Sequence, residues 1–301
     1  MELSEKTFTS QANFHLTGIV PIAGQNLDFN LPYPDCLLPI APNYTLIQAA
    51  IVECAYAGCD TIWIVCNDDI APIVRHTVGD YIEDPMSFYN TKTRTSDTRR
   101  RIPIFWTPVH PKDRDKRDCL SWSVVYGALI ALKVSSQISK WTIPDKYYVS
   151  FPYGLIDPDS IWKSRKDIRS PKNFYLSSAN RTVQDNVYTS FTFGKEEFIK
   201  YRRNVRSGTG QYTTEEVDER GIPRSKLPLE KRWSARFFEL GEVFKNLDLV
   251  SSNVLEVSFY NIGKWTEYVK FMSSEYAKNI ERPPLELFSY KEFNPVGKDL
   301  D

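Results

Sequence analysis

The sequence predicts an α/β fold in which helices flank a mixed, mostly parallel central sheet. Two observations predict it. Short apolar runs alternate with segments of helical periodicity, and the runs are apolar almost without interruption, as in strands that are covered on both faces. The order strand, helix, strand, helix over residues 17–78 is typical of a parallel sheet. The 301 residues contain no internal repeat, and we expect one domain over residues 1–301.

The first third of the chain supplies the clearest elements. Residues 17–24 are an apolar run that ends in a glycine, which predicts a buried strand entering a loop. Residues 45–58 carry apolar side chains at helical spacing and end in a glycine where a C-terminal cap belongs. Residues 61–66 are a continuous apolar strand, and a short helix is predicted over 70–78.

The pattern continues less regularly towards the C-terminus. The further predicted strands are 102–109, 147–151, 186–193 and 253–259. The further predicted helices are 121–139, 160–165, 195–203, 233–247 and 264–279. Residues 206–230, rich in Gly, Thr, Glu and Pro, predict a long exposed loop, and residues 281–301 predict a tail along the surface.

Composition and charge limit the function. Lys and Arg number 38 and Asp and Glu number 38, so the net charge of zero disfavours a nucleic-acid partner. The five cysteines form no C-x-x-C pair, which favours buried free thiols in a reducing cytoplasm over a zinc or redox site. No run reaches the roughly 20 apolar residues of a membrane span. We therefore expect a soluble cytoplasmic protein that does not enter the membrane.

Several short segments follow one another in an order that suggests a family. They are residues 22–24, 34–40, 57–58, 62–65 and 79–80. In order and spacing they resemble the glycine loop, the Pro-Lys-x-Leu-x-Pro segment, the Ala-Gly helix end, the next strand and the Gly-Asp of sugar-phosphate nucleotidyltransferases. Residues 122–128, 151–159 and 258–268 resemble three later elements of that family. The resemblance also extends to proteins of T4-like marine bacteriophages, which implies the host cytoplasm.

The resemblance implies a nucleotide-diphospho-sugar-transferase-like fold and a function. The family transfers a nucleotidyl group to a sugar phosphate with the help of Mg²⁺, so a nucleotide or nucleotide sugar is the expected ligand. The expected nucleotide-binding residues lie in the loop after the first strand and at the start of a later helix. They are Ala23, Gly24, Gln25, Asn26, Trp122 and Ser123.

The chain departs from the family where charge matters. The glycine loop has one glycine and no arginine, and Asp35 stands where the family has a phosphate-contacting lysine. The first metal-binding Gly-Asp corresponds to Tyr153 and Gly154, and the second metal aspartate maps near Asn261. A carboxylate beside a polyphosphate repels it, so the family reaction requires other cations here.

Residues 110–118 contain four cations and three aspartates between a strand and a helix. One interpretation is an alternative phosphate clamp that includes Lys112 and Arg114; the other is a solvated turn whose charges nearly cancel. Asp157 would bind the metal from just past a strand, or it would cap the helix over 160–165. Residues 67–69 follow a strand, where ligands bind open sheets, or they cap the next helix.

Two functions follow from these residues. In the first, the chain is an enzyme whose cleft is lined by Asp35, Lys112, Arg114 and Asp157. In the second, it is a catalytically inactive domain of the same fold that binds a protein partner or forms a homo-oligomer. The missing cations favour the second function, and the retained order of segments favours the first.

Overall fold

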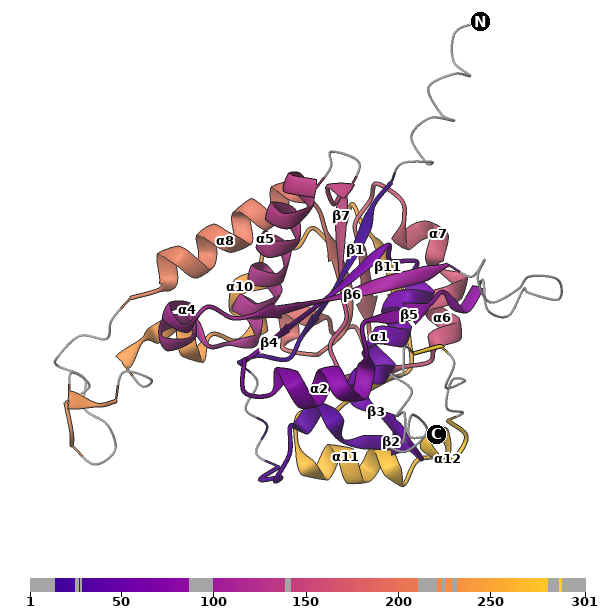
Figure 1. Ribbon diagram of the computed structural model, residues 1–301, viewed down its shortest axis with the longest axis horizontal. Coiled ribbons are helices and arrows are strands. Elements are labelled where there is room, and N and C mark those ends of the chain that lie inside the picture. Colours follow the sequence, from indigo (N-terminus) through magenta and orange to yellow (C-terminus); the bar gives the residue numbers. More distant parts are fainter. Residues whose placement is uncertain are drawn as a thin grey trace, which may run out of the picture.

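The computed structural model describes residues 14–24, 27, 29–86, 100–138, 142–210, 221–223, 226–228, 232–280 and 287–288. A sheet of eight strands lies between helices (Figure 1). From edge to edge the strands are β11 (Asn253–Glu256), β9 (Phe174–Ser177), β10 (Phe191–Phe193), β7 (Lys146–Val149), β1 (Leu16–Pro21), β4 (Thr61–Cys66), β6 (Arg101–Pro108) and β5 (Tyr81–Glu83). Neighbours are parallel except where β10 or β5 is one of the pair. The predicted mixed, mostly parallel α/β fold is therefore confirmed.

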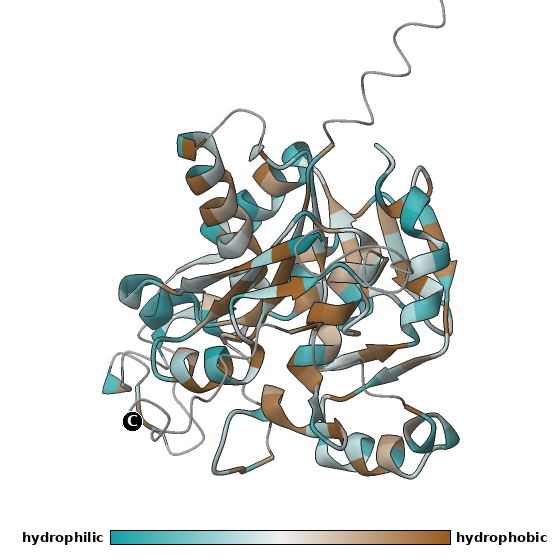
Figure 2. Cartoon of the chain, turned by 45° about the vertical axis from the view of Figure 1, so that its right-hand side comes forward, coloured by the Kyte–Doolittle hydropathy of each residue, from teal (hydrophilic) through white to brown (hydrophobic). Residues whose placement is uncertain are grey.

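Two apolar cores cover the two faces of the sheet. The first contains side chains from α1 (Leu46–Ala57), α2 (Ala71–Val78), α6 (Pro158–Lys163), α7 (Arg165–Ile168) and α11 (Trp265–Met272). The second contains side chains from α5 (Leu120–Ile138), α8 (Lys195–Gly208) and α10 (Leu240–Phe244). Brown, the hydrophobic colour, runs through the central strands in Figure 2. This three-layer arrangement explains why the central strands are apolar without interruption.

Strand β1 shows how the two cores share one strand. Val20 packs into the first core and Ile19 into the second, because successive side chains of a strand point to opposite faces. The neighbouring helix α1 begins at a capping box in which the Thr45 main-chain N–H donates to Oε1 of Gln48 over 3.0 Å. It ends at Gly58, whose φ of +85° is the left-handed cap that the sequence predicts.

Smaller elements connect the main layers. They are η1 (Asp35–Leu37), the β2–β3 hairpin (Pro39–Ala41 and Tyr44–Thr45), the antiparallel pair β8 (Gly154–Ile156) and β12 (Phe259–Asn261), η4 (Val183–Asp185), η6 (Ser234–Phe237) and α12 (Glu275–Lys278). Within the described ranges, no helix has the length and apolar character needed to cross a membrane.

The charged segment 110–118 forms a helix, α4 (Pro111–Arg117), and the prediction of a turn there was wrong. Proline is at the first helical position, and His110 caps the helix because its Nδ1 accepts the Lys112 N–H at 3.2 Å. Every side chain of α4 is at least partly exposed, so the helix has no apolar face by which periodicity could reveal it.

Three further predictions about the second half differ from the structure. The helix predicted over 233–247 is two short helices, η6 and α10, and the one over 264–279 is α11 followed by α12. The strand predicted over 186–193 is reduced to β10. The predicted loop 206–230 begins later, since α8 continues to Gly208, and residues 211–220 lie outside the described residues. The predicted tail 281–301 is also outside them, apart from residues 287–288.

Candidate functional site

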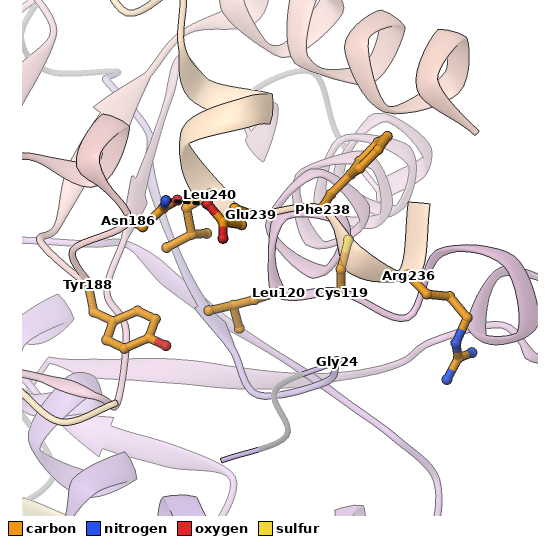
Figure 3. Close-up of a pocket in the computed structure, with 9 residues that line it drawn as sticks. All are labelled: Gly24, Cys119, Leu120, Asn186, Tyr188, Arg236, Phe238, Glu239 and Leu240. Carbon is orange, nitrogen blue, oxygen red and sulfur yellow. Dashed lines mark hydrogen bonds between the residues drawn. The ribbon is translucent and has the colours of Figure 1, made fainter. Parts of the chain in front are cut away.

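A cavity of about 290 Å³ lies at the C-terminal end of β1 (Figure 3). Four segments meet around it: the turn after β1, the start of α5, the segment before β10 and the connection from η6 to α10. Its lining residues are Gly24, Cys119, Leu120, Asn186, Tyr188, Arg236, Phe238, Glu239 and Leu240. In open α/β sheets, ligands bind at this edge, beyond the carboxyl ends of the strands.

One side of the cavity is the contact between Gly24 and the start of α5. Gly24 has a φ of +75°, and a Cβ built on it would lie 2.5 Å from the carbonyl carbon of Cys119. The first N–H groups of a helix have no acceptor within the helix. Ser123 makes the first regular bond of α5, from its N–H to the Cys119 carbonyl over 3.1 Å, and the Trp122 N–H donates to Sγ of Cys119 over 3.4 Å. Leu120 begins the 19-residue α5 at the cavity. A long helix therefore presents its positive end here.

The opposite wall carries a fixed amide–carboxylate pair. Asn186 has a φ of +59°, and its Nδ2 donates to Oε2 of Glu239 over 2.5 Å. The Asn186 Oδ1 accepts the Gly241 N–H over 2.8 Å, so both ends of the amide are held. A Cβ on Gly241 would come within 2.4 Å of the Gln184 carbonyl oxygen, so this contact also depends on a glycine. The carboxylate of Glu239 is thus oriented while remaining exposed.

Tyr188 is seated by two residues that the resemblance associates with metal binding. Asn261 accepts the Tyr188 main-chain N–H at its Oδ1 over 3.1 Å. Gly154 is paired with Asn261 in the β8–β12 register, and a Cβ on it would lie 2.2 Å from the Tyr188 carbonyl oxygen. In Figure 3 the tyrosine ring extends away from the amide–carboxylate pair, and its hydroxyl points towards the side of the cavity where Leu120 and Gly24 lie.

The residues at these positions do not fit the Mg²⁺ that the resemblance implies. The fold brings positions 154 and 261 together, yet they carry a glycine and an amide, and Tyr153 beside them is buried. Asp157 is exposed and caps α6, where its Oδ1 accepts the Asp159 N–H over 3.2 Å. In the part of the chain that the structure describes, no group of three His, Cys, Asp or Glu side chains converges to hold a metal ion.

Of the residues predicted to bind the nucleotide, one lines the cavity and three are buried beside it. Gly24 lines the cavity, whereas Ala23, Trp122 and Ser123 are buried. The Ser123 hydroxyl donates to the Ala23 carbonyl over 2.8 Å and fastens the turn after β1 to α5. Gln25 and Asn26 lie outside the described residues.

The residues predicted to be catalytic lie on separate elements. Asp35 is on η1, and loss of solvent raises the pKa of its carboxyl despite a hydrogen bond from the Leu27 main chain. Lys112 and Arg114 are on α4, which Figure 1 places on the opposite side of the molecule from α6 and Asp157. The structure therefore does not bring Asp157 together with the pair on α4.

Arg236 connects α4 to the cavity. Its guanidinium donates to the main-chain carbonyls of Arg114 and Asp115 and lies 3.4 Å from an oxygen of Asp118. In Figure 3 its side chain extends away from the other lining residues. The positive charge is thus used to hold α4 against η6, and only part of the residue borders the cavity.

Comparison with known proteins identifies the fold. No protein-family model and no curated protein sequence matches the chain. A candidate glucose-1-phosphate thymidylyltransferase from Bacillus anthracis, solved with sucrose, is similar with a TM-score of 0.52 and 10% identity. The similarity covers 89% of this chain and 98% of that one. A UTP-bound UGPase from Acinetobacter baumannii has a TM-score of 0.51 and 10% identity, covering 91% of this chain and 96% of that one.

These similarities establish a nucleotide-diphospho-sugar-transferase-like fold. At 10% identity they establish the fold alone, because one fold supports many chemistries. Both structures are of bacterial proteins, and the comparisons give no support to the expected likeness to bacteriophage proteins.

Proposed function

We propose that the chain binds a nucleotide or nucleotide sugar at the cavity beside Gly24. The observation that carries this proposal is the meeting of a glycine turn, a long helix N-terminus and a fixed carboxylate at the carboxyl edge of the sheet. The start of α5 favours a phosphate group, since the amides and the helix dipole there attract anions. Glu239, Asn186 and Tyr188 offer the oxygen and amide groups that recognise sugar hydroxyls.

The volume of the cavity decides which part of the ligand it holds. Ligand pockets commonly measure about 300–1,000 Å³, and this cavity of about 290 Å³ is at the small end. It suits a sugar and its phosphate, with the nucleoside lying over the ends of β4 and β6. Asn67 directly follows β4, and its buried Oδ1 has no hydrogen-bond partner. That oxygen would accept an N–H of the base.

The proposed reaction is transfer of a nucleotidyl group to a sugar phosphate. Lys112 and Arg114 are the proposed phosphate clamp, and Asp35 is the proposed acidic residue of the site. Asp157 takes no part in it, because it caps α6 on the opposite side of the molecule from α4. A Mg²⁺ ion would arrive with the nucleotide and be held chiefly by its phosphate oxygens and water, as is usual for this ion. The UTP in the Acinetobacter structure makes UTP the first nucleotide to try.

The alternative is an inactive domain that binds a protein partner. Two observations favour it: Asp35 stands where a cation is needed, and positions 154 and 261 carry no carboxylate. In this alternative the protein keeps the fold and the cavity but does not catalyse nucleotidyl transfer.

Melting curves and a turnover assay separate these functions. A ligand that binds only the folded protein raises its melting temperature, by an amount that grows with ligand concentration over the dissociation constant. We expect UTP, dTTP, UDP-glucose or glucose 1-phosphate to raise it, and Glu239→Gln to reduce the rise. Glu196→Gln, an exposed site on α8 with the same loss of charge, should leave the rise intact.

Pyrophosphate release from UTP and glucose 1-phosphate, measured with Mg²⁺, tests the transfer step. Release that falls in Lys112→Ala and Arg114→Ala supports the enzyme. A melting shift without pyrophosphate release supports ligand binding alone. No shift with any of these ligands contradicts the proposed function.

A further inference from the structure

Three arginine side chains gather where the end of α4 meets the end of α8. Arg117 is the last residue of α4, and Arg202 and Arg206 are one helical turn apart on α8. Burial lowers the pKa of Arg202, and the positive charges of Arg206 and Arg117 lower it further. Residues 202, 206 and 209 share one face of the end of α8, and Oγ1 of Thr209 accepts the Arg117 Nε–H over 3.2 Å, so the three arginines lie on the same side of that helix.

Arg117 is held in a fixed position within this group. Its Nε donates to Oγ1 of Thr209 over 3.2 Å, and its NH1 donates to Oδ1 of Asp113 over 3.0 Å. The guanidinium carbon lies 4.8 Å from the centre of the Trp122 ring, and only 19% of the side chain is exposed. An arginine that is stacked and bonded in this way is already ordered, so it loses little freedom when it binds an anion.

The other two arginines lack a counter-charge. Among the described residues, neither Arg202 nor Arg206 forms an ion pair, and Asp113 is the carboxylate that pairs with Arg117. The Nε of Arg202 is buried and has no hydrogen-bond partner. A buried donor without an acceptor is costly, and three cations with one carboxylate add repulsion to that cost.

The α8 helix dipole explains only part of this arrangement. Cations near a helix C-terminus are favourable, which accounts for Arg206 in the last turn of α8. Arg202 lies a turn earlier, and the dipole supplies no acceptor for its buried Nε. An anion between the two helices would supply the acceptor and neutralise the repulsion.

We infer that Arg117, Arg202 and Arg206 form a binding site for a phosphate group. The planar guanidinium fork matches two oxygens of a phosphate, and a dianion offsets two of the three positive charges. The phosphate is either a free ion or part of a larger ligand such as a nucleotide. The site does not depend on the proposed function of the cavity, because none of the three residues lines that cavity.

Calorimetric titration with inorganic phosphate at low ionic strength tests this site. We expect the dissociation constant to rise about tenfold or more in Arg202→Gln and in Arg206→Gln, the usual effect of losing one charge-assisted hydrogen bond. Arg203→Gln is the matched control, with the same charge change on the same helix, and it should stay within about twofold. Absence of phosphate binding to the wild type, or an equal loss in Arg203→Gln, overturns the site.

Melting temperatures without phosphate check that the arginines do not serve the fold itself. Removing one of three repelling charges should leave Arg202→Gln at least as stable as the wild type at low salt, because the helix dipole does not account for Arg202. A lower melting temperature would show that Arg202 has a structural partner and would overturn the site. Added UTP then identifies the source of the phosphate. Displacement of phosphate by UTP assigns the site to a nucleotide, simultaneous binding assigns it to free phosphate, and either result supports the site.

Discussion

Gly24 and Cys119 approach so closely that no side chain fits between them. A Cβ on Gly24 would lie 2.5 Å from the Cys119 carbonyl carbon and 2.6 Å from both its Cα and its nitrogen. Each of these is a main-chain atom, which cannot turn aside as a side chain can. The turn after β1 is therefore locked to the start of α5, and one side of the cavity is set by this contact.

Gly24→Ala should destabilise the protein and distort the cavity. The left-handed φ costs a non-glycine residue roughly 1–2 kcal/mol, and the contact with the Cys119 main chain adds to that cost. Gly221→Ala is the matched control, because its φ of +74° is similar and no atom of the described residues lies within 4 Å of its missing Cβ. Urea unfolding should show a larger loss for Gly24→Ala. Equal losses would mean that the contact with Cys119 is not tight.

The buried carboxyl group of Glu53 should make the free energy of unfolding depend on pH. Its carboxylate is buried and accepts hydrogen bonds from Tyr148, Ser150 and Ser190 over 2.6, 2.9 and 2.5 Å. Burial raises the pKa from 4.5 to about 7, although the three hydrogen bonds lower it in part. The folded state thus holds this proton more tightly than the unfolded state does.

A raised carboxyl pKa stabilises the fold at low pH, and this contribution is lost as the pH rises from about 4.5 to about 7. Glu53→Gln keeps the shape, accepts at Oε1 and donates to Ser150, and does not titrate. We expect its stability to vary less across that interval, by on the order of 2–3 kcal/mol relative to the wild type. Denaturant unfolding at several pH values measures this. Parallel stability curves for the two proteins would contradict the assignment.

Replacing Lys146 by a side chain without a donor should lower the stability of the protein strongly. The Lys146 side chain is buried, and its Nζ donates to the main-chain carbonyls of Ile168, the last residue of α7, and of Ser170 and Lys172 beyond it. Lys146→Met fills similar space but leaves those carbonyls without their donor, at a cost of about 3 kcal/mol or more. The melting temperature of Lys146→Met measures this loss. Lys133→Met is the control, because the exposed Lys133 side chain on α5 has no comparable contact in the described part of the chain, and its melting temperature should change little.

The sequence predicts the central strands and long helices because their pattern is local. The apolar runs of β1 and β4 and the helical spacing of α1 and α5 need no knowledge of distant residues. Helix α4 lacks that signal: seven residues without an apolar stripe are held by contacts from Arg236 and from Thr209, far along the chain. Its existence depends on tertiary structure.

The cavity is predictable only in part for the same reason. Gly24 stands out in the sequence as the glycine after a buried strand. Asn186, Tyr188 and Glu239 come from irregular segments of the second half, and no spacing marks them. They meet the start of α5 only after β12 pairs with β8 and α10 packs against η4, and such long-range contacts leave no local pattern.

Calorimetric titration of UDP-glucose tests binding at the cavity most directly. We predict a dissociation constant below about 1 mM for the wild type, since the cavity offers one phosphate site and one fixed carboxylate. Glu239→Gln should weaken binding about tenfold, or about 1.4 kcal/mol, and Glu196→Gln should bind like the wild type. No heat of binding, or equal affinity in Glu239→Gln and the wild type, would contradict a sugar-nucleotide site at this cavity.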